Sequence, residues 1–330
     1  MIKIDQLKLD ISADDIQIKR AISKKLRVAE NAIKDYSILK KSIDARKKPD
    51  VYFVYSIAVS LSAEDEARIL SKSKKDNNIN KYTPKDYVLP KVEKADYKRP
   101  IVIGAGPAGL FAAYILALNN MAPILLERGK RVEERTEDII KFWETGVLDT
   151  SSNVQFGEGG AGTFSDGKLN TLVNDKLGRN KFVLETFVKF GAPSNILYDY
   201  KPHIGTDILK GVIANMRNEI ISLGGEFYFE TRVDAFIIEN NKLCGVKAKD
   251  KVFYSDSVIL AIGHSARDTF LTLHNSSIHM EAKDFAVGFR IEHPQDMISK
   301  VMYSDAYKKL EPAPYKLAAN LHNGRGIYSF

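Results

Sequence analysis

Three glycines with a fixed spacing, Gly104, Gly106 and Gly109, are the residues of this sequence that point most clearly to chemistry. They follow a short apolar run, Ile101–Ile103, and precede a longer one, Leu110–Leu118, an order typical of a strand, a tight turn and a helix. In such a turn the first glycine permits the bend, the second lets backbone approach a diphosphate, and the third lets the helix pack on the sheet. The helix N-terminus adds free N–H groups and a partial positive charge. The pattern predicts a dinucleotide-binding turn.

Pro107 and Ala108 occupy the first turn of the predicted helix, where the missing N–H of proline costs nothing. A membrane-spanning helix is the alternative, because residues 101–118 carry no charge, but three glycines and a proline at its start argue against it. The next predicted strand ends at Glu127, which lies 23 positions after Gly104. An acid near this spacing binds a ribose hydroxyl, which fits FAD or NAD better than a dinucleotide with a 2′-phosphate.

A second glycine-rich segment, residues 157–169, holds five glycines in thirteen residues. Hydroxyl and charged residues among glycines can form a loop of inward-pointing N–H and hydroxyl groups around an anion or a flavin ring. The alternative is a flexible surface loop, although Phe156, Phe164 and Leu169 are apolar anchors that favour an ordered one. The candidate binding residues are Gly160, Gly162, Thr163, Ser165, Asp166, Gly167 and Lys168.

A third signal is the apolar run over residues 258–263, predicted to be a strand whose terminal Gly263 lets backbone pass close to a cofactor. His264 follows directly and is the candidate catalytic side chain, although a flavoenzyme does not require one. His203 and His293 are weaker candidates, each with a structural alternative: His203 precedes a predicted helix start, where it can form a structural hydrogen bond, and His293 lies at a predicted strand end, where it can simply be exposed.

The composition, 44% apolar and 28% charged over 330 residues, is ordinary for a soluble globular protein. The single cysteine, Cys244, is predicted to be a small core residue. It excludes an internal disulfide framework, a cysteine-rich metal site and a Cys-x-x-Cys redox pair, and we predict no metal. The N-terminus has no apolar signal region, which predicts a cytoplasmic protein that does not bind a membrane.

The net charge of +7 comes from the N-terminal third of the chain. Residues 101–330 hold 26 of the 49 basic and 27 of the 42 acidic residues, so the predicted nucleotide-binding part is nearly neutral. A basic segment before it is more often solvated than bound to a polyanion. The charge does not predict nucleic-acid binding, but it motivates an RNA-acting protein as an alternative.

The predicted elements divide the chain into four segments: residues 1–70, 71–99, 100–263 and 264–330. The first has the order strand, helix, strand, strand, helix, which favours a ferredoxin-like α+β module. The second, rich in Lys, Asn and Asp, is predicted to be a linker. The third is predicted to be a Rossmann-like α/β domain with inserted segments, and the fourth to begin an incomplete substrate domain.

Within the first segment, helices are predicted to start at Ser12 and Ser62, and the first to bury Ile16, Ile22 and Leu26. Strands are predicted over residues 2–9, 33–43 and 51–61, and residues 87–89, within the linker, are a candidate last strand of the same module. In the third segment, helices are predicted over 132–145, 179–190 and 206–222, and strands over 227–230, 235–238, 243–249 and 258–262.

These motifs together resemble a family of FAD-dependent dehydrogenases, NAD(FAD)-utilising flavoproteins of the glutathione-reductase type. The stretches that carry the resemblance are Gly104–Gly109, Glu127–Gly129, Ser152–Leu169, Lys201–Asp207 and Ala286–Gln295. The resemblance implies a glutathione-reductase-type FAD-binding domain preceded by an α+β module. It implies FAD as the cofactor, with Gly104, Gly106 and the helix from Pro107 at its diphosphate.

The same resemblance places the adenosine ribose at Glu127, the adenine against backbone at Val233, and the flavin side near residues 157–169 and Gly263. Arg128, next to Glu127, is a further candidate cofactor-binding residue. It implies an FAD-dependent oxidoreductase that transfers hydride or electrons to or from an organic substrate, with NAD(P)H as a candidate donor. Family members extend beyond the last residue of this sequence and return to the FAD domain. This difference motivates one alternative, a truncated, non-catalytic FAD-binding fragment. The basic N-terminal third motivates the other, an RNA-acting flavoprotein.

Overall fold

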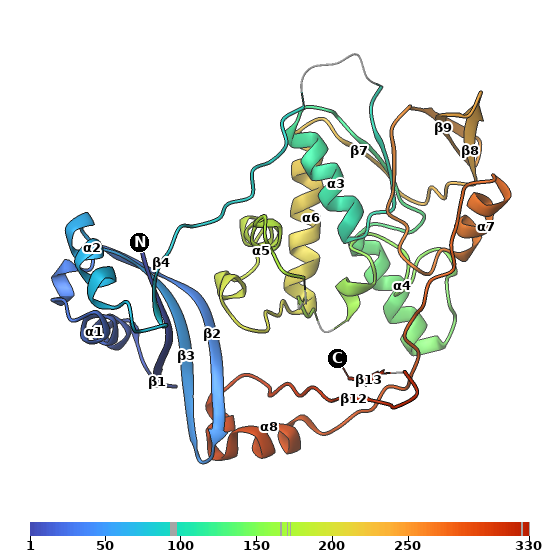
Figure 1. The fold of residues 1–330 in the computed structure, drawn as a ribbon. Coiled ribbons are helices and arrows are strands. Elements are labelled where there is room, and N and C mark those ends of the chain that lie inside the picture. The colour runs from blue at the N-terminus through green and yellow to red at the C-terminus, as the bar shows by residue number, and fades with distance from the viewer. Residues whose placement is uncertain (93–97, 166, 170, 172, 325, 330) are drawn as a thin grey trace. The chain divides into compact units, whose positions relative to one another are not determined.

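The computed structural model describes residues 1–92, 98–165, 167–169, 171, 173–324 and 326–329. The chain divides into two compact units, whose elements Figure 1 labels along the chain. Unit 1 combines the two ends of the chain and consists of Met1–Pro84, Tyr198–Tyr200 and Asp284–Phe330. Unit 2 consists of Lys85–Leu197 and Lys201–Lys283.

The N-terminal part of unit 1 is a four-stranded antiparallel sheet in the order β2-β3-β1-β4, with two helices packed on it. Its elements are β1 (Ile2–Asp10), α1 (Asp15–Leu26), η1 (Glu30–Ala32), β2 (Asp35–Lys47), β3 (Asp50–Ser60), α2 (Ala63–Lys72) and β4 (Ile79–Lys81). Alternate residues of β1 and β3, such as Ile4 and Ile57, are buried against Ile22 of α1 and Ile69 of α2. The predicted period of two holds for Tyr55, Ile57, Val59 and Leu61, which share this core. Val51 packs in another cluster, and Ala58 is also buried.

Helix α1 starts later than the sequence predicts. Its N-cap is Asp14, whose carboxylate accepts the N–H of Gln17 while the Gln17 side chain accepts the N–H of Asp14. The Ser12 hydroxyl instead donates to Asp10. The reciprocal pair of Asp14 and Gln17 satisfies two backbone N–H groups, whereas a cap by Ser12 would satisfy only one, and the helix therefore begins at Asp15.

This shift also corrects the predicted apolar stripe, because Ile18 is buried with Ile22 and Leu26 whereas Ile16 is exposed. The last strand of the sheet is β4, not residues 87–89. Only one residue of β4 is buried, so its sequence carries no alternating pattern. The start of α2 at Ser62 is confirmed.

The C-terminal part of unit 1 packs on the β2-β3 hairpin through an apolar cluster that includes Val51, Tyr303 and Ala313. The elements of this part are α8 (Gln295–Tyr303), η4 (Ser304–Lys309), β12 (Ala318–Asn320) and β13 (Gly326–Tyr328). None of them was predicted from the sequence.

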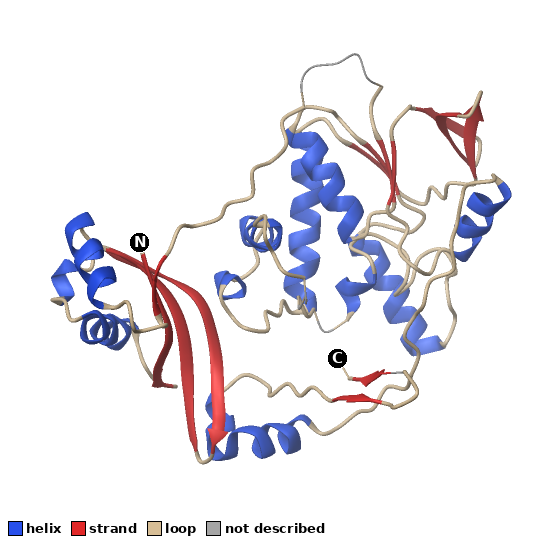
Figure 2. Cartoon of the chain, in the orientation of Figure 1, coloured by secondary structure: helices blue, strands red, loops and turns tan. Residues whose placement is uncertain are grey.

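Unit 2 is built on a four-stranded parallel sheet in the order β11-β5-β6-β7, drawn in red in Figure 2. Its strands are β5 (Ile101–Ile103), β6 (Ile124–Leu126), β7 (Glu226–Tyr228) and β11 (Val258–Leu260). The chain proceeds from β5 to β6 and β7 on one side, and later adds β11 on the other side. Ligands of open parallel sheets bind where the order reverses in this way, at the carboxyl ends of the strands. The expected α/β fold with a parallel sheet is confirmed.

Five helices accompany this sheet: α3 (Pro107–Leu118), α4 (Val132–Thr145), α5 (Arg179–Lys189), α6 (Thr206–Ser222) and α7 (Arg267–Asn275). Helices α3 and α6 lie side by side, as Figure 1 shows, and share the main apolar core with α5. Leu110 and Tyr114 of α3 and Met216 of α6 are buried there. The helices predicted over 132–145, 179–190 and 206–222 are confirmed, and α7 was not predicted.

A second, three-stranded antiparallel sheet in the order β10-β9-β8 completes unit 2. It consists of β8 (Ala235–Glu239), β9 (Lys242–Ala248) and β10 (Lys251–Tyr254). Val246 of β9 packs with Ile103 and Leu126 of the parallel sheet. The predicted strands that correspond to β7, β8, β9 and β11 are confirmed to within a few residues, whereas β10 was not predicted.

Candidate functional site

Steric contacts within the protein require glycine at two positions of the turn between β5 and α3. Gly104 has φ +101°, and a Cβ atom there would lie 2.4 Å from the carbonyl oxygen of Ala261. A Cβ atom on Gly109 would lie 1.8 Å from the carbonyl oxygen of Gly104. Both distances are too short for any side chain, so these glycines hold the turn against the end of β11 and the helix against the turn.

Gly106, in contrast, is not required by the surrounding protein. A Cβ atom there would meet only the Cα of Gly160, at 3.9 Å, an ordinary van der Waals distance, and its φ of −72° suits any residue. Pro107 and Ala108 are exposed, so the N-terminus of α3 faces open space. Contacts within the protein therefore do not explain why residue 106 is glycine. A glycine at the open N-terminus of a helix lets an anionic group approach the backbone closely.

Glu127 holds three loops together at the end of β6. Its carboxylate is buried and accepts the N–H groups of Ala105 at 2.7 Å, Gly129 at 2.9 Å and Gly157 at 3.0 Å. These donors belong to the glycine turn, the β6–α4 connection and the second glycine-rich segment. An ionised carboxylate has about four acceptor positions, so three are already used.

Arg135 of α4 organises the first part of the second glycine-rich segment. Its side chain is completely buried, and its guanidinium donates hydrogen bonds of 2.6–3.3 Å. The acceptors are the carbonyl oxygens of Asn153, Val154, Gly157, Glu158 and Gly160. A Cβ atom on Gly157 would lie 2.4 Å from Arg135 Cδ, so this glycine makes room for the arginine. Burial lowers the pKa of Arg135 to about 10, which leaves it a cation at neutral pH.

Glu158 is fully buried beside this arginine. Its Oε2 atom accepts the N–H of Val132 at 2.8 Å and forms an ion pair with Arg217 of α6, which also pairs with Glu133 at 2.7 Å. Burial raises the pKa of Glu158 to about 7, although Arg217 acts in the opposite direction. The hydrogen bond from Arg217 lowers the pKa of Glu133. The network ties α4, α6 and the glycine-rich segment together.

Two polar atoms of this segment are buried without a hydrogen-bond partner among the residues that the structure describes: Oε1 of Glu158 and Oγ1 of Thr163. Thr163 is fully buried, and a Cβ atom on Gly159 would lie 2.2 Å from its Oγ1. A buried polar atom left unpaired costs roughly 1–3 kcal/mol. Such atoms call for a specific explanation, such as local strain or an ordered water.

Residues 161–165 of the predicted loop form a short helix and a hydrogen-bonded turn. Residues Ala161–Phe164 form a short 3-10 helix, η2, in which Gly162 is exposed. The Ser165 hydroxyl donates to the Gly162 carbonyl at 3.0 Å. Asp166 lies outside the described residues.

Gly167 and Lys168 belong to a short paired stretch rather than to an open loop. The N–H of Ile204 donates to the Gly167 carbonyl at 3.0 Å, and a Cβ atom on Gly167 would lie 1.8 Å from the Ile204 carbonyl oxygen. Lys168 forms an isolated antiparallel bridge with His203. The segment over 157–169 therefore combines a packed part, which touches α3, and a paired part.

Arg128 links the end of β6 to α7. Its guanidinium forms an ion pair with Asp268 at 2.8 Å, contacts Oγ1 of Thr269 at 3.1 Å and lies 4.3 Å from the ring centre of Phe156. Asp268 also pairs with Arg232. The side chain is thus fixed on three sides.

The remaining predicted residues lie in different environments. The Val233 side chain is buried between the two sheets, so only its backbone is available to a ligand. Gly263 and His264 are exposed after β11, and Nε2 of His264 is 3.4 Å from the Ser265 hydroxyl. His293 belongs to unit 1, where its ring contacts Tyr315. The structure thus gives His264 no acidic partner among the described residues.

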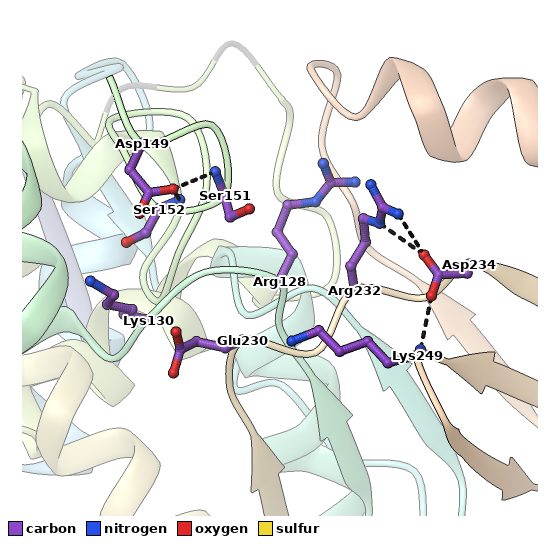
Figure 3. Close-up of a pocket in the computed structure, with 9 residues that line it drawn as sticks. All are labelled: Arg128, Lys130, Asp149, Ser151, Ser152, Glu230, Arg232, Asp234 and Lys249. Carbon is purple, nitrogen blue, oxygen red and sulfur yellow. Dashed lines mark hydrogen bonds and ion pairs between the residues drawn. The ribbon is translucent and has the colours of Figure 1, made fainter. Parts of the chain in front are cut away.

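Beside Arg128, a pocket of about 200 Å³ opens at the carboxyl ends of β6 and β7. Figure 3 shows its walls, which come from four stretches of unit 2. These are Arg128 and Lys130 after β6, residues 149–152, residues 230–234 after β7, and Lys249 after β9. The pocket is polar, with side chains of both charges.

Sequence reasoning did not select Arg135, Glu158 or Arg217. A signal was present for both arginines, because each lies on the buried stripe of its helix: Arg135 between Val132 and Ile139, and Arg217 next to Met216. A charged residue on a buried stripe needs partners. Glu158 lies in a glycine-rich segment with no periodic pattern, so no comparable signal marks it.

Among the described residues, no group of three or more His, Cys, Asp and Glu side chains is arranged to hold a metal ion. The described helices also include none with the length and apolar character needed to cross a membrane.

Comparison with sequence families gives two matches, both within unit 1. Residues 1–60 match a domain of unknown function, and residues 284–330 match the family described as FAD-dependent protein, C-terminal domain-like. The chain is 41% identical over 333 residues to an uncharacterised protein of Clostridium beijerinckii. The match covers 100% of this chain and 62% of that protein, so the chain spans less than two thirds of the relative's length.

Solved structures of low overall similarity were also found. Thermovibrio ammonificans THI4 has a TM-score of 0.36 at 15% identity, over 55% of this chain and 64% of that one. L-proline dehydrogenase from P. horikoshii has a TM-score of 0.31 at 15% identity, over 56% and 57% of the two chains. Thioredoxin reductase from Lactococcus lactis has a TM-score of 0.27 at 18% identity, over 50% and 35%.

Proposed function

We propose that this chain binds FAD at the carboxyl ends of β5 and β11 and is part of an FAD-dependent oxidoreductase. The observation that carries the proposal is Gly106: it stands at the open N-terminus of α3, at the reversal of a parallel sheet, and nothing in the protein requires it to be glycine. A diphosphate at this place would use the helix N-terminus as its binding site.

One further observation supports FAD over other dinucleotides: residues 284–330 match a family of FAD-dependent proteins. Thr163 lies in the loop packed against Gly106, but its hydroxyl is enclosed by protein and does not discriminate between dinucleotides. We place the flavin side of the cofactor near Gly160, Gly162 and Thr163, with Gly263 on the other flank.

Bound flavin would supply hydride or single-electron transfer, and the protein would supply orientation and electrostatics. In this proposal Gly104 and Gly109 shape the turn, Glu127 joins the surrounding loops, and Val233 offers backbone to the adenine. His264, exposed beside Gly263, is the candidate side chain for proton transfer. The fold is then of the glutathione-reductase type, with NAD(P)H as donor, and the enzyme is cytoplasmic.

The order of strands in the N-terminal sheet, β2-β3-β1-β4, supports a ferredoxin-like module in unit 1. Modules of this kind serve many different functions.

The direct test is a titration of the purified chain with FAD, followed by flavin fluorescence and by the visible spectrum after gel filtration. The wild type is expected to retain the flavin. Gly106→Ala is expected to weaken FAD binding at least about tenfold, because its Cβ would occupy the space of the diphosphate without disturbing the protein.

Gly211→Ala is the matched control: Gly211 is exposed in the interior of α6, and a Cβ atom there meets nothing within 4 Å. This variant should fold at least as well as the wild type and bind FAD equally. Equal binding by Gly106→Ala would remove the turn as the site. Failure of the wild type to take up FAD would overturn the proposal for this chain, and anaerobic bleaching by NADH or NADPH would identify the donor.

A further inference from the structure

A second pocket of unit 2 lies at the outer edge of the parallel sheet. Its volume is about 440 Å³, and it is lined by residues 225–229 in and around β7, by the end of α6 and by Arg131 just before α4. Strand β7 is one edge of the sheet and β11 is the other, and Figure 1 labels β7 together with α6. The residues that line this pocket are not among those proposed to bind FAD. The pocket is therefore a separate candidate site.

Part of the pocket lining is aromatic. Phe227 and Phe229 are two positions apart in the chain, and their rings stack with centres 5.8 Å apart and an angle of 19° between the planes. Both side chains are only partly buried. Ile221 of α6 adds an apolar side chain to the lining and is 47% exposed. Accessible apolar and aromatic surface of this kind favours a ligand with a flat, apolar part.

Arg131 places a positive charge beside the aromatic rings. Its side chain is exposed, and its guanidinium carbon lies 5.6 Å from the ring centre of Phe229. Among the described residues, the guanidinium forms no hydrogen bond or ion pair, and it takes no part in capping α4. The pocket thus presents a cation whose N–H groups are available to a ligand.

The acid nearest to Arg131 in the chain is engaged by another arginine. Arg217, which also lines the pocket, donates to both carboxylate oxygens of Glu133, at 2.7 and 3.2 Å. It also forms an ion pair with the buried Glu158. Because this bidentate pair satisfies Arg217 and Glu133 together, Arg131 is left as the uncommitted cation of the described pocket.

The other polar groups of the pocket fit one negative charge rather than two. The Glu226 carboxylate already accepts from Arg99 and from the Tyr228 hydroxyl. The side chain of Asn218 is exposed, and its amide has no partner within the described part of the chain. One guanidinium and one amide can donate to the two oxygens of a carboxylate, whereas a phosphate dianion would need a second cation.

We propose that this pocket binds a small aromatic monocarboxylate, with its ring against Phe227 and Phe229 and its carboxylate on Arg131 and Asn218. The ring would cover apolar surface that is now exposed to water, and the carboxylate would give Arg131 the acid partner that the described residues do not supply. Binding at this edge of the sheet does not require FAD, so the pocket is a second ligand site of unit 2.

The test measures binding of 2-naphthoate and of its neutral analogue 2-naphthamide to the same chain by calorimetry, with and without saturating FAD. The wild type is expected to bind 2-naphthoate about tenfold more tightly than 2-naphthamide, because hydrogen bonds between ionised groups are stronger than those to a neutral amide. In Arg131→Gln this ratio should fall to about one. Arg179→Gln, which removes an exposed arginine at the start of α5 outside the pocket, should keep the wild-type ratio.

A second variant tests the pocket without removing the arginine. Ile221→Glu adds a carboxylate to the lining and should weaken binding of 2-naphthoate about tenfold through repulsion and competition for Arg131. Ile140→Glu is the matched control, because Ile140 is 45% exposed on α4 and lies outside the pocket. It should bind 2-naphthoate as the wild type does.

A wild type that does not bind 2-naphthoate, or binds both probes equally, would overturn the inference. Persistence of the tenfold ratio in Arg131→Gln would also overturn it, because the carboxylate would then lie elsewhere. Loss of 2-naphthoate binding in the presence of FAD would assign the probe to the cofactor site, which contradicts this inference and leaves the proposed function intact. Thermal unfolding checks that each variant is folded, as expected for exchanges at exposed positions.

Discussion

The guanidinium of Arg135 lies 3.0 Å from the carbonyl oxygen of Gly160, and this contact sets the position of the glycine-rich segment. A Cβ atom on Gly160 would lie 3.2 Å from Gly106 Cα and 3.0 Å from Pro107 Cδ. A side chain buried in α4 therefore fixes the loop that touches the first turn of α3. The shape of the candidate site therefore depends on Arg135, although the Arg135 side chain is buried and does not line the site.

We expect Arg135→Lys to destabilise the protein by about 3 kcal/mol, because one ammonium cannot satisfy the five carbonyl oxygens that the guanidinium serves. Urea unfolding measures the loss. Limited proteolysis should cut first within residues 153–160, where the acceptors lie. Arg179→Lys, at an exposed position at the start of α5, is the control and should change stability by less than about 0.5 kcal/mol. An Arg135→Lys variant as stable and resistant as the control would contradict this role.

Glu158 should make stability fall as the pH rises. Its pKa is raised to about 7 in the folded protein by burial, so the folded state holds this proton more tightly than the unfolded state. The stabilisation is complete below the unfolded pKa, near 4.5, and is lost as the pH rises to about 7.

In Glu158→Gln this titration is absent. The free energy of unfolding of the wild type minus that of the variant should therefore decrease between pH 5 and pH 7 and change little above pH 8. Urea unfolding at each pH measures the difference. A difference that grows with pH would show that the pair with Arg217, rather than burial, controls the carboxyl.

Gly104→Ala should cost more than about 2 kcal/mol, because the new Cβ would collide with the Ala261 carbonyl oxygen and the φ of +101° is unsuited to alanine. Gly263→Ala is the matched comparison: its φ is +69°, but a Cβ atom there meets nothing within 4 Å. It should cost only about 1 kcal/mol, the price of the left-handed conformation. Thermal unfolding of both variants separates the collision from the backbone strain, and equal losses would rule the collision out.

Glu127→Gln should lower the free energy of unfolding by roughly 1–3 kcal/mol, because a single amide oxygen cannot accept from Ala105 on one side and from Gly129 and Gly157 on the other. Glu134→Gln, at an exposed position in the first turn of α4, is the control. Hydrogen exchange offers a second readout, since the amides of Ala105, Gly129 and Gly157 should exchange faster in the variant. Unchanged exchange at all three would contradict the role of Glu127 in joining the loops.

The sequence by itself determined those features that depend on local physics. The glycine turn between β5 and α3 follows from spacing alone, because only glycine adopts its dihedral angles and allows the close packing around it. Helices α4 and α6 could be predicted from the sequence because their buried residues recur with the helical period. Strands of three residues could still be placed when they were continuously apolar, as β5 is.

Only the tertiary structure decided which polar groups meet. Glu127 and Gly157 are 30 positions apart, Arg217 and Glu158 are 59 apart, and each contact depends on how the intervening helices pack. Local patterns also failed at β4 and in the C-terminal segment of unit 1, since a three-residue strand with one buried residue gains its structure from the partner strand. The turn is a property of neighbouring residues in the chain, whereas the walls of the site are a property of the packed fold.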